Sequence, residues 1–332
     1  MRIKHVSYPR AALIGNPSDG FYGKTIAFPF SNFQVEATLT TRQGILIPQA
    51  SDEVYQGHET FYSKYLSEGG AGSKHILNAT LKVFFEYCKE QGIKLHDQGF
   101  EIEFESTIPR EVGLAGSSAI ITAVFKTLLE FYEVTIALEV QANLILNVET
   151  KEMGISAGLQ DRVVIVYEHP IYMNFDKQLM EERGYGDYQR LQASLFENIY
   201  IAYSTSESEG SEVVHNDLGH RYRNGDQQVH NVMNELSDLT AAFMNELNSS
   251  RELVKLGLYM NTNFDLRQSI CSISKNNLKM IQLAREVGAS AKFTGSGGAI
   301  IGNFTSDAMY SNLEMAFKKN EIQIFKPRIV ST

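Results

Sequence analysis

Hydrophobic residues recur with two different periods along this chain, and the periods predict helices and strands in both halves. Residues 76–88 carry apolar side chains at helical spacing, whereas residues 100–104 alternate apolar side chains with glutamate, as a half-buried strand does. Further helices are expected over about 116–132, 136–150, 210–287 and 307–319, and further strands over 11–14, 25–30, 33–39, 162–167, 199–203, 290–293, 299–304 and 322–325. This mixture, with hairpins in the first half, favours an α+β fold over a doubly wound parallel sheet.

Turn-forming residues subdivide this pattern. Ser31-Asn32 predicts a hairpin between the strands on either side of it, and the glycines of 69–72 predict a break before the next helix. Residues 176–190 are polar and contain two glycines, so they are the best candidate for a domain boundary. We therefore expect two domains, residues 1–180 and 181–332, in agreement with the usual size of about 100–200 residues per domain.

Composition and charge exclude several classes of protein. Apolar residues make up 43% of the chain, enough for a large core, and the net charge of −9 argues against binding a nucleic-acid backbone over a broad surface. Two cysteines, Cys88 and Cys271, exclude a disulfide framework and fit a reducing cytoplasm. No apolar run reaches about 18 residues and none precedes Arg10, so we expect a cytoplasmic enzyme without a membrane partner.

The strongest local signal is the loop Pro109 to Ala119, which follows a predicted strand and leads into a long helix. Its glycines permit a tight turn, and the unpaired N–H groups at the start of a helix suit a phosphate. It is not a Walker loop, because no Gly-Lys-Ser/Thr ends it. A capped helix after a glycine turn accounts for the pattern equally well. The candidate phosphate-binding residues are Pro109, Gly113, Leu114, Ala115, Gly116, Ser117, Ser118 and Ala119.

A second glycine cluster, Lys292 to Ala299, lies between two predicted strands. Alone, such a cluster is more typical of a flexible hairpin. Its interest is that each half of the chain then has one loop of small residues, as a nucleotide lodged between two domains requires.

Two carboxylates and one arginine complete the candidate chemistry. Glu149 and Asp161 lie twelve residues apart, with Gly154 and Gly158 between them. Beside a phosphate loop, one carboxylate would hold Mg²⁺ and the other would accept a proton from an attacking hydroxyl. Arg10 would keep Asp161 ionised and stabilise a migrating phosphoryl group. Turn or cap residues and a surface arginine are the plainer alternatives.

These pieces, in this order, resemble the superfamily of galactokinase, homoserine kinase, mevalonate kinase and phosphomevalonate kinase, abbreviated GHMP. The three signatures correspond to residues 9–19 (PRAALIGNPSD), 109–119 and 292–299. The resemblance spans nearly the whole chain. It implies a two-domain α+β fold, with a mixed α/β N-terminal domain like a ribosomal-protein domain and a ferredoxin-like C-terminal domain. It also implies ATP and Mg²⁺ as cofactors.

The resemblance also assigns roles to individual residues. Ser118 is similar to the magnesium-ligating serine of the family, and Glu149 to its second magnesium ligand. Asp161 is similar to the catalytic base. Arg10 matches the position of the cation near the transferred phosphate, and Asp19 matches the aspartate that binds sugar hydroxyls in galactokinases.

One departure bears on the substrate. Galactokinases carry Gly-Glu-His-Thr-Asp after the first strand, whereas residues 15–19 read Gly-Asn-Pro-Ser-Asp, which argues against galactose. Residues 14–19, 157–162, 263–267 and 292–298 are instead similar to plant-type glucuronokinases. This resemblance implies phosphorylation of the anomeric hydroxyl of glucuronate.

Charge supports an anionic substrate independently. ATP and a uronate are both anions, so a chain of net charge −9 needs a locally positive pocket. Arg267 is the first candidate for the uronate carboxylate and Arg162 the second, although either could form a surface ion pair instead. The candidate substrate-binding residues are Asn16, Ser18, Asp19, Arg162, Asp265, Arg267, Lys292, Thr294, Gly295, Ser296 and Gly297.

Three other functions remain open at this point. They are another sugar 1-kinase or a heptose-phosphate kinase, a decarboxylase that acts after phosphorylation, and a non-catalytic sensor of ATP and sugar. The joint presence of Arg10, Ser118, Glu149 and Asp161 argues against the sensor. The sequence leaves open whether the protein is a monomer or a homodimer. Residues 50–75 are candidates for the adenine pocket, with none assigned individually.

Overall fold

The computed structural model describes residues 1–67, 75–204 and 212–332, with the backbone alone for 212–217. It divides into two compact units. Unit 1 contains Met1–Tyr8, Phe33–Ile108 and Gly116–Ala157, and unit 2 contains Pro9–Asn32, Pro109–Ala115 and Gly158–Thr332. This division differs from the expected domains 1–180 and 181–332, whose boundary stays a prediction. The expected break at 69–72 and the expected helix start at 210 lie outside the described residues.

Unit 1 is a five-stranded sheet covered by helices. The strand order is β1-β4-β7-β5-β6, antiparallel except for β5 beside β7. The strands are β1 (Arg2–Ser7), β4 (Val35–Arg42), β5 (Ile45–Ile47), β6 (Ser51–Tyr55) and β7 (Gly99–Ser106). The helices are α1 (His58–Ser67), α2 (Ile76–Glu90), α3 (Gly116–Phe131) and α4 (Leu138–Asn147), with a π-helical turn, η2 (Val148–Glu152), directly after α4. Helix α3 packs on β1 and β4, and buried aromatic side chains such as Phe84, Phe100 and Phe125 form the core.

Unit 2 contains two antiparallel four-stranded sheets. The first has the order β2-β3-β8-β9, with β2 (Arg10–Ile14), β3 (Lys24–Pro29), β8 (Ile171–Asn174) and β9 (Asp187–Arg190). The second has the order β11-β12-β10-β13, with β10 (Ile199–Tyr203), β11 (Lys292–Phe293), β12 (Ala299–Asn303) and β13 (Gln323–Phe325).

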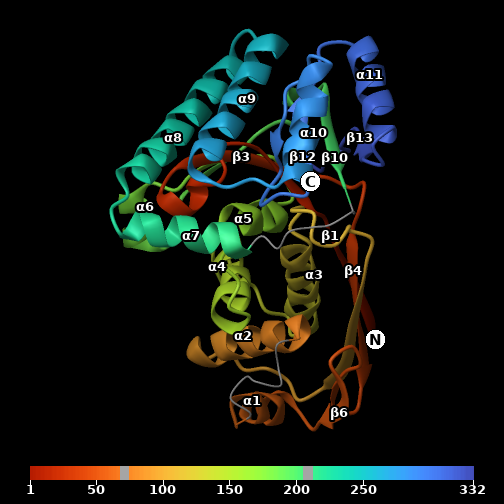
Figure 1. The fold of residues 1–332 in the computed structure, drawn as a ribbon. Helices are drawn as coiled ribbons and strands as arrows, with labels where there is room; N and C mark the ends of the chain where they lie inside the picture. The colour runs from red at the N-terminus through yellow and green to blue at the C-terminus, as the bar shows by residue number, and fades with distance from the viewer. Residues whose placement is uncertain (68–74, 205–211) are drawn as a thin grey trace. The chain divides into compact units, whose positions relative to one another are not determined.

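Seven α-helices of the described residues belong to unit 2. They are α5 (Gln160–Tyr167), α6 (Lys177–Arg183), α7 (Glu212–Arg223), α8 (Gln227–Asn248), α9 (Leu253–Ile270), α10 (Lys275–Glu286) and α11 (Asp307–Lys318), with 3₁₀ turns η1 (Ser18–Phe21) and η3 (Ala193–Leu195). Asp226, Ser274 and Ser306 cap α8, α10 and α11 by accepting hydrogen bonds from first-turn N–H groups. Helices α8 and α9 run side by side, and α10 and α11 pack on the second sheet (Figure 1). Within the described residues, no helix is long and apolar enough to cross a membrane.

The expected hairpin between residues 25–30 and 33–39 is wrong. Strand β3 pairs with β2 and β8, whereas β4 pairs with β1 and β7, so the two strands belong to different sheets. Each has both edges occupied by other strands, and Ser31-Asn32 therefore connects two sheets rather than two neighbours. The residues of a turn alone do not determine which strands will pair with the two strands that it connects.

The expected strand at 162–167 is also wrong, because these residues lie in helix α5. Four consecutive β-branched residues, from Val163 to Val166, are buried there. A short segment that is apolar on all sides has no period that distinguishes a helix from a strand, and packing against β2 and β3 decides the outcome. The residues at 176–190 form α6 and β9 rather than a linker.

Candidate active site

Three separate segments of unit 2 meet at Arg10, the first residue of β2. Its side chain is almost fully buried, and Nη1 donates to the carbonyl of Gly113 at 2.8 Å and to that of Thr294 at 3.3 Å. The backbone of β2 extends the same contacts, since Ala12 N donates to Thr294 O at 2.9 Å. The residues of the first predicted motif thus bind both glycine loops.

The two glycine loops are in direct backbone contact. A Cβ atom on Gly113 would lie 2.5 Å from the carbonyl oxygen of Gly297, and one on Gly295 would lie 2.5 Å from that of Gly113. No side chain fits between them, so glycine is required at both positions. The second cluster is a fixed partner of the first and not the flexible hairpin that it resembles in isolation.

The loop Pro109–Ala115 has the backbone form of an anion-binding concavity. Glu111, Gly113 and Ala115 all have positive φ, at 58°, 70° and 58°, and alternate with residues outside that region. Such alternation turns successive N–H groups toward one side of the chain. The next residue, Gly116, begins the 16-residue helix α3. The N–H groups of this loop are donors of the kind that a phosphate needs.

Arg10 also holds Asp161 by both of its carboxylate oxygens. Nε donates to Oδ1 and Nη2 to Oδ2, each at 2.5 Å, and Gln160 adds a third donor at 3.2 Å. Burial by itself would raise the pKa of Asp161, but the charges of Arg10 and Arg162 and these hydrogen bonds lower it to about 2. The carboxylate, in the first turn of α5, is therefore ionised at neutral pH.

Asp19, in the turn η1, has the opposite environment. Burial and the nearby charge of Asp161 raise its pKa to about 7, although Arg162 and Arg10 oppose the shift. Gly158 makes room for it, since a Cβ there would lie 2.2 Å from Asp19 Oδ2. Unlike Asp161, Asp19 forms no ion pair within 4 Å among the described residues. Two neighbouring carboxyl groups therefore have pKa values on opposite sides of the usual range.

Unit 1 contains a second cluster of candidate residues. The carboxylate of Glu149 is buried, and it accepts hydrogen bonds from Ser117 Oγ at 2.5 Å and from Ser118 Oγ at 3.1 and 3.2 Å. The serines lie in the first turn of α3, and Glu149 lies in the π-helical turn η2 rather than at the end of an α-helix. Rare π-helical turns are frequent at functional sites.

Comparisons with known proteins show the family of this chain. A model of the N-terminal domain of GHMP kinases matches residues 75–169. The chain is 39% identical over 313 residues to "Probable glucuronokinase 2" of Arabidopsis thaliana, which covers 90% of this chain and 83% of that protein. It is 37% identical over 311 residues to "Glucuronokinase 1" of the same plant, with 90% and 84% covered. The chain belongs to the GHMP kinase family. It is a small-molecule kinase, a phosphotransferase with an alcohol group as acceptor.

Solved structures confirm the two-domain α+β fold of a GHMP kinase. The mevalonate kinase of Methanococcus jannaschii matches with a TM-score of 0.71 at 16% identity, covering 100% of this chain and 98% of that one. The Streptococcus pneumoniae phosphomevalonate kinase in complex with phosphomevalonate and AMPPNP matches with a TM-score of 0.74 at 15% identity, covering 99% and 100%.

Several residues expected to bind substrate in this GHMP kinase instead have structural contacts. The ammonium of Lys292 is buried and donates to Ala12 O, Asn16 Oδ1 and Phe293 O, so all three of its N–H bonds are used. The two Nη atoms of buried Arg267 donate to Gly295 O at 2.6 Å and to Ser296 O at 3.0 Å. Both residues fix the glycine loops of the kinase.

Three further candidates differ in their surroundings. Asp265 is exposed and pairs with Arg285 at 2.8 Å, and Ser18 is buried and donates to Lys24 O at 3.1 Å. Arg162, in contrast, lies beside the carboxylates, with Nη1 2.8 Å from Gly158 O and 3.5 Å from Asp161 Oδ2. Of the two arginines expected to bind the uronate carboxylate, Arg162 is the one that lies beside Asp161.

The sequence did not single out the residues that anchor Glu149. Glu152, in the same π-helical turn, accepts hydrogen bonds from Lys82 Nζ at 2.8 Å and from Tyr65 OH at 3.0 Å. Lys82 is buried and also binds Glu86 at 2.7 Å, and these bonds raise its pKa although burial opposes the shift. Helices α1 and α2 thereby fix the turn that presents Glu149. The sequence offered one signal of these contacts, since Lys82 interrupts the apolar residues of the helix predicted over 76–88.

The residues of unit 1 fit Mg²⁺ held jointly with a nucleotide. Among the described residues no group of three or more His, Cys, Asp or Glu side chains could hold a metal ion. Ser118 and Glu149 supply two hard oxygen ligands, and Mg²⁺ characteristically takes one or two protein ligands and completes its shell with phosphate oxygens and water. The donor set therefore suits a metal that arrives with a nucleotide.

The opposite pKa shifts of Asp19 and Asp161 predict opposite effects of removing each charge. Asp19 titrates higher in the folded than in the unfolded state, so its contribution to stability is complete below about pH 4 and is lost as the pH rises through 7. Asp161 titrates lower in the folded state, so its contribution is present above about pH 4 and is lost as the pH falls through 2. At pH 8, Asp19→Asn should raise the free energy of unfolding and Asp161→Asn should lower it, each by on the order of 2 kcal/mol.

Denaturant unfolding of both variants and the wild type at pH 5 and pH 8 measures this. The advantage of Asp19→Asn should shrink at pH 5, where the wild-type carboxyl is largely protonated. Shifts of the same sign for both variants at pH 8 would contradict the electrostatic assignment.

Proposed function

We propose that this GHMP kinase uses ATP and Mg²⁺ to phosphorylate the anomeric hydroxyl of glucuronate, forming glucuronate 1-phosphate, with Asp161 as general base. The observation that carries the proposal is the identity of 37–39% to the two Arabidopsis glucuronokinases over 90% of the chain. The low cysteine content favours action in the cytoplasm.

In the proposed reaction, the proton of the anomeric hydroxyl moves to Asp161 as the hydroxyl oxygen bonds to the γ-phosphorus. The bond between the γ-phosphorus and the bridging oxygen breaks, and its electron pair leaves with ADP. A pKa of about 2 makes Asp161 a weak base, which suits a loose transition state in which the hydroxyl loses its proton late. Arg10 fixes the orientation of the carboxylate and places positive charge beside it.

The loop Pro109–Ala115 would bind the phosphates through its N–H groups. Ser118 and Glu149 would hold Mg²⁺, which neutralises charge on the phosphate oxygens when bound. Loss of either ligand should therefore affect the metal more than the sugar.

Ser118→Ala and Glu149→Gln should each raise the Mg²⁺ concentration for half-maximal rate, by about tenfold, with a smaller change in the KM for sugar. The measurement is a Mg²⁺ titration at saturating ATP and sugar. Ser274→Ala is the matched control, since Ser274 caps α10 and is not a candidate site residue. Unchanged half-saturation in both main variants would exclude the metal role and leave Ser118 as a structural hydrogen-bond donor to Glu149.

Asp161→Asn should lower kcat by about 10²–10⁴-fold, the usual effect of removing a general base. Asp187→Asn is the matched control, because it makes the same change at an exposed aspartate that is paired with Arg183 outside the candidate site. Initial rates are measured at a temperature where unfolding curves show each variant to be folded. A near-normal kcat for Asp161→Asn would exclude the role.

Substrate choice can be measured with a panel of sugars. We expect kcat/KM for glucuronate to exceed that for glucose and galactose by at least about 10²-fold, because a neutral sugar cannot make the charge-assisted hydrogen bonds that the C6 carboxylate makes to a cation. Arg162→Gln should lower kcat/KM for glucuronate and so reduce its advantage over the neutral sugars. Arg267→Gln should lower the rate with every sugar, since Arg267 anchors the loop at residues 292–299.

The same panel separates the alternatives. Preference for a phosphorylated heptose or for glucose would overturn the uronate assignment within the family. Release of CO₂ would indicate a decarboxylase, and absence of turnover with all sugars, despite stabilisation by ATP in a melting experiment, would indicate a sensor.

A further inference from the structure

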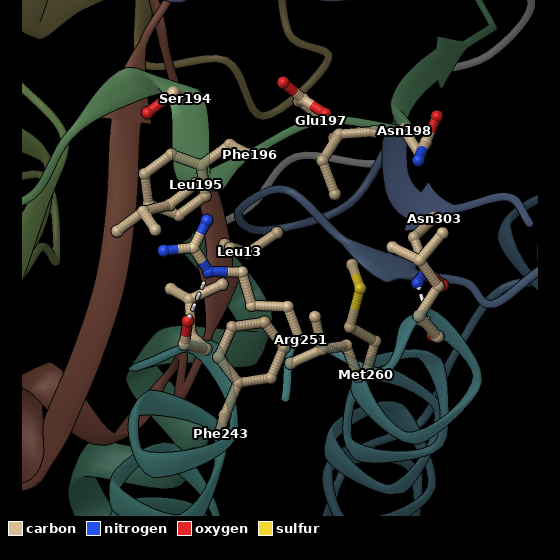
Figure 2. A pocket seen from close by; sticks show the side chains of 14 residues that line it. Leu13, Ser194, Leu195, Phe196, Glu197, Asn198, Phe243, Arg251, Met260 and Asn303 are labelled. Atoms are coloured by element: carbon tan, nitrogen blue, oxygen red, sulfur yellow. Dashed lines mark hydrogen bonds between the residues drawn. The ribbon is translucent and has the colours of Figure 1, made fainter. Parts of the chain in front are cut away.

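Unit 2 contains a pocket that none of the three motifs accounts for. It has a volume of about 210 Å³ and is bordered by the segment Ser194–Ile199, by the facing ends of α8 and α9, by Asn303 of β12 and by Leu13 of β2. Figure 2 shows Phe243 and Met260 below the opening and Glu197 and Asn198 above it. It contains no residue of the predicted phosphate or substrate sites, although Leu13 belongs to the first motif, residues 9–19.

The floor of the pocket is apolar and well ordered by packing. Phe243 and Met260 are almost completely buried, as are Leu13, Leu247 and Leu256. The side chain of Asn303 is held by two hydrogen bonds, since Oδ1 accepts from Ser290 and Nδ2 donates to Leu253 O. A water molecule against these apolar side chains would find few hydrogen-bond partners. An apolar cavity of about 150 Å³ can hold a molecule of benzene. The space suits an apolar group about the size of one aromatic ring.

Arg251, at the mouth of the pocket, is a cation with N–H groups that make no hydrogen bond among the described residues. Arg251 Nε donates to Leu247 O at 3.1 Å, and within the described part of the chain neither Nη atom has a hydrogen-bond or ion-pair partner. The guanidinium extends over the pocket from its α8–α9 side (Figure 2). Glu197, which also borders the pocket, is exposed and forms no ion pair with it. One cation next to one carboxylate favours a ligand of single negative charge over a phosphate dianion.

Arg251 is held in place by its backbone. Its φ of 53° is unusual for a residue with a side chain, and Asn198 at the opposite edge has a φ of 57°. Glu246, itself buried, fixes the turn by accepting hydrogen bonds from Ser250, from the backbone N–H of Glu252 and from Lys255. Backbone strain that surrounding contacts maintain at a pocket edge is characteristic of ligand sites.

We propose that this pocket binds a small amphipathic carboxylate, with its ring-sized apolar group on Phe243, Leu256 and Met260 and its carboxylate on Arg251. The site is separate from the kinase reaction and does not depend on the sugar that the enzyme uses. Its ligand contacts β2 through Leu13, three residues after Arg10.

The test compares 3-phenylpropanoate with the neutral 3-phenylpropanol on the full-length protein. Both probes carry the same ring, so the difference between them isolates the carboxylate. Labelling the methionine methyl groups with ¹³C allows the Met260 signal to report occupancy, and the Met260→Leu variant assigns that signal. We expect the acid to shift the Met260 resonance in a saturable way and to bind about tenfold more tightly than the alcohol, the usual scale of a charge-assisted hydrogen bond.

Arg251→Gln should remove that preference, so that acid and alcohol bind equally. Lys318→Gln, which removes an exposed cation from α11, is the matched control and should leave it intact. Leu256→Phe should fill the cavity and abolish binding of both probes, and its unfolding curve shows whether it is folded. Equal binding of both probes by the wild type, a preference that survives Arg251→Gln, or an unmoved Met260 signal at millimolar probe would each overturn the proposal.

Discussion

The candidate site of unit 2 depends on a single guanidinium. Arg10 holds the two oxygens of Asp161 and the carbonyls of Gly113 and Thr294, so one side chain joins β2, both glycine loops and α5. Each acceptor is distant in sequence, and loss of Arg10 would leave the buried carboxylate of Asp161 without its bidentate partner. Arginine suits this position because its planar fork binds a carboxylate bidentately while its other N–H groups remain available.

The sequence singled out Arg10, the loop at 109–119, Glu149 and Asp161 from residue type and spacing, because their chemistry is local. The structure describes their contacts, and their roles stay predictions. Two errors, the hairpin across Ser31-Asn32 and the strand at 162–167, arose where partners distant in the chain decide the conformation. The π-helical turn at Glu149 was not predicted for the same reason, since Lys82 and Tyr65, which bind Glu152 in that turn, are distant in the chain.

The structure shows hydrogen bonds of the buried cations of unit 2 that the sequence did not predict. Spacing alone suggested that Arg267 and Lys292 face the substrate, because they stand in motifs of an otherwise acidic chain. Arg267 donates to the carbonyls of Gly295 and Ser296 in the second glycine loop, and Lys292 donates to Ala12 O and Asn16 Oδ1 of the first motif. Asn263, one helical turn before Arg267 on α9, adds a bond to Gly15 N and another to Asn16 O. Sequence reasoning recognised the residues but could not distinguish a loop anchor from a ligand-binding group.

These neutral acceptors have an electrostatic consequence. A hydrogen bond to a carbonyl satisfies the N–H groups of Lys292 and Arg267 but leaves their charge uncompensated. Burial lowers the pKa of Lys292 well below its usual value, and the charges of Arg267 and Arg10 lower it further. Carboxylates at these positions would stabilise the cations but would cancel their field. The charged form of Lys292 is therefore disfavoured, and an anion that binds beside it would favour that form. Anion binding and the anchoring of residues 292–299 would be coupled for this reason, since the same ammonium donates to Ala12 O and Asn16 Oδ1.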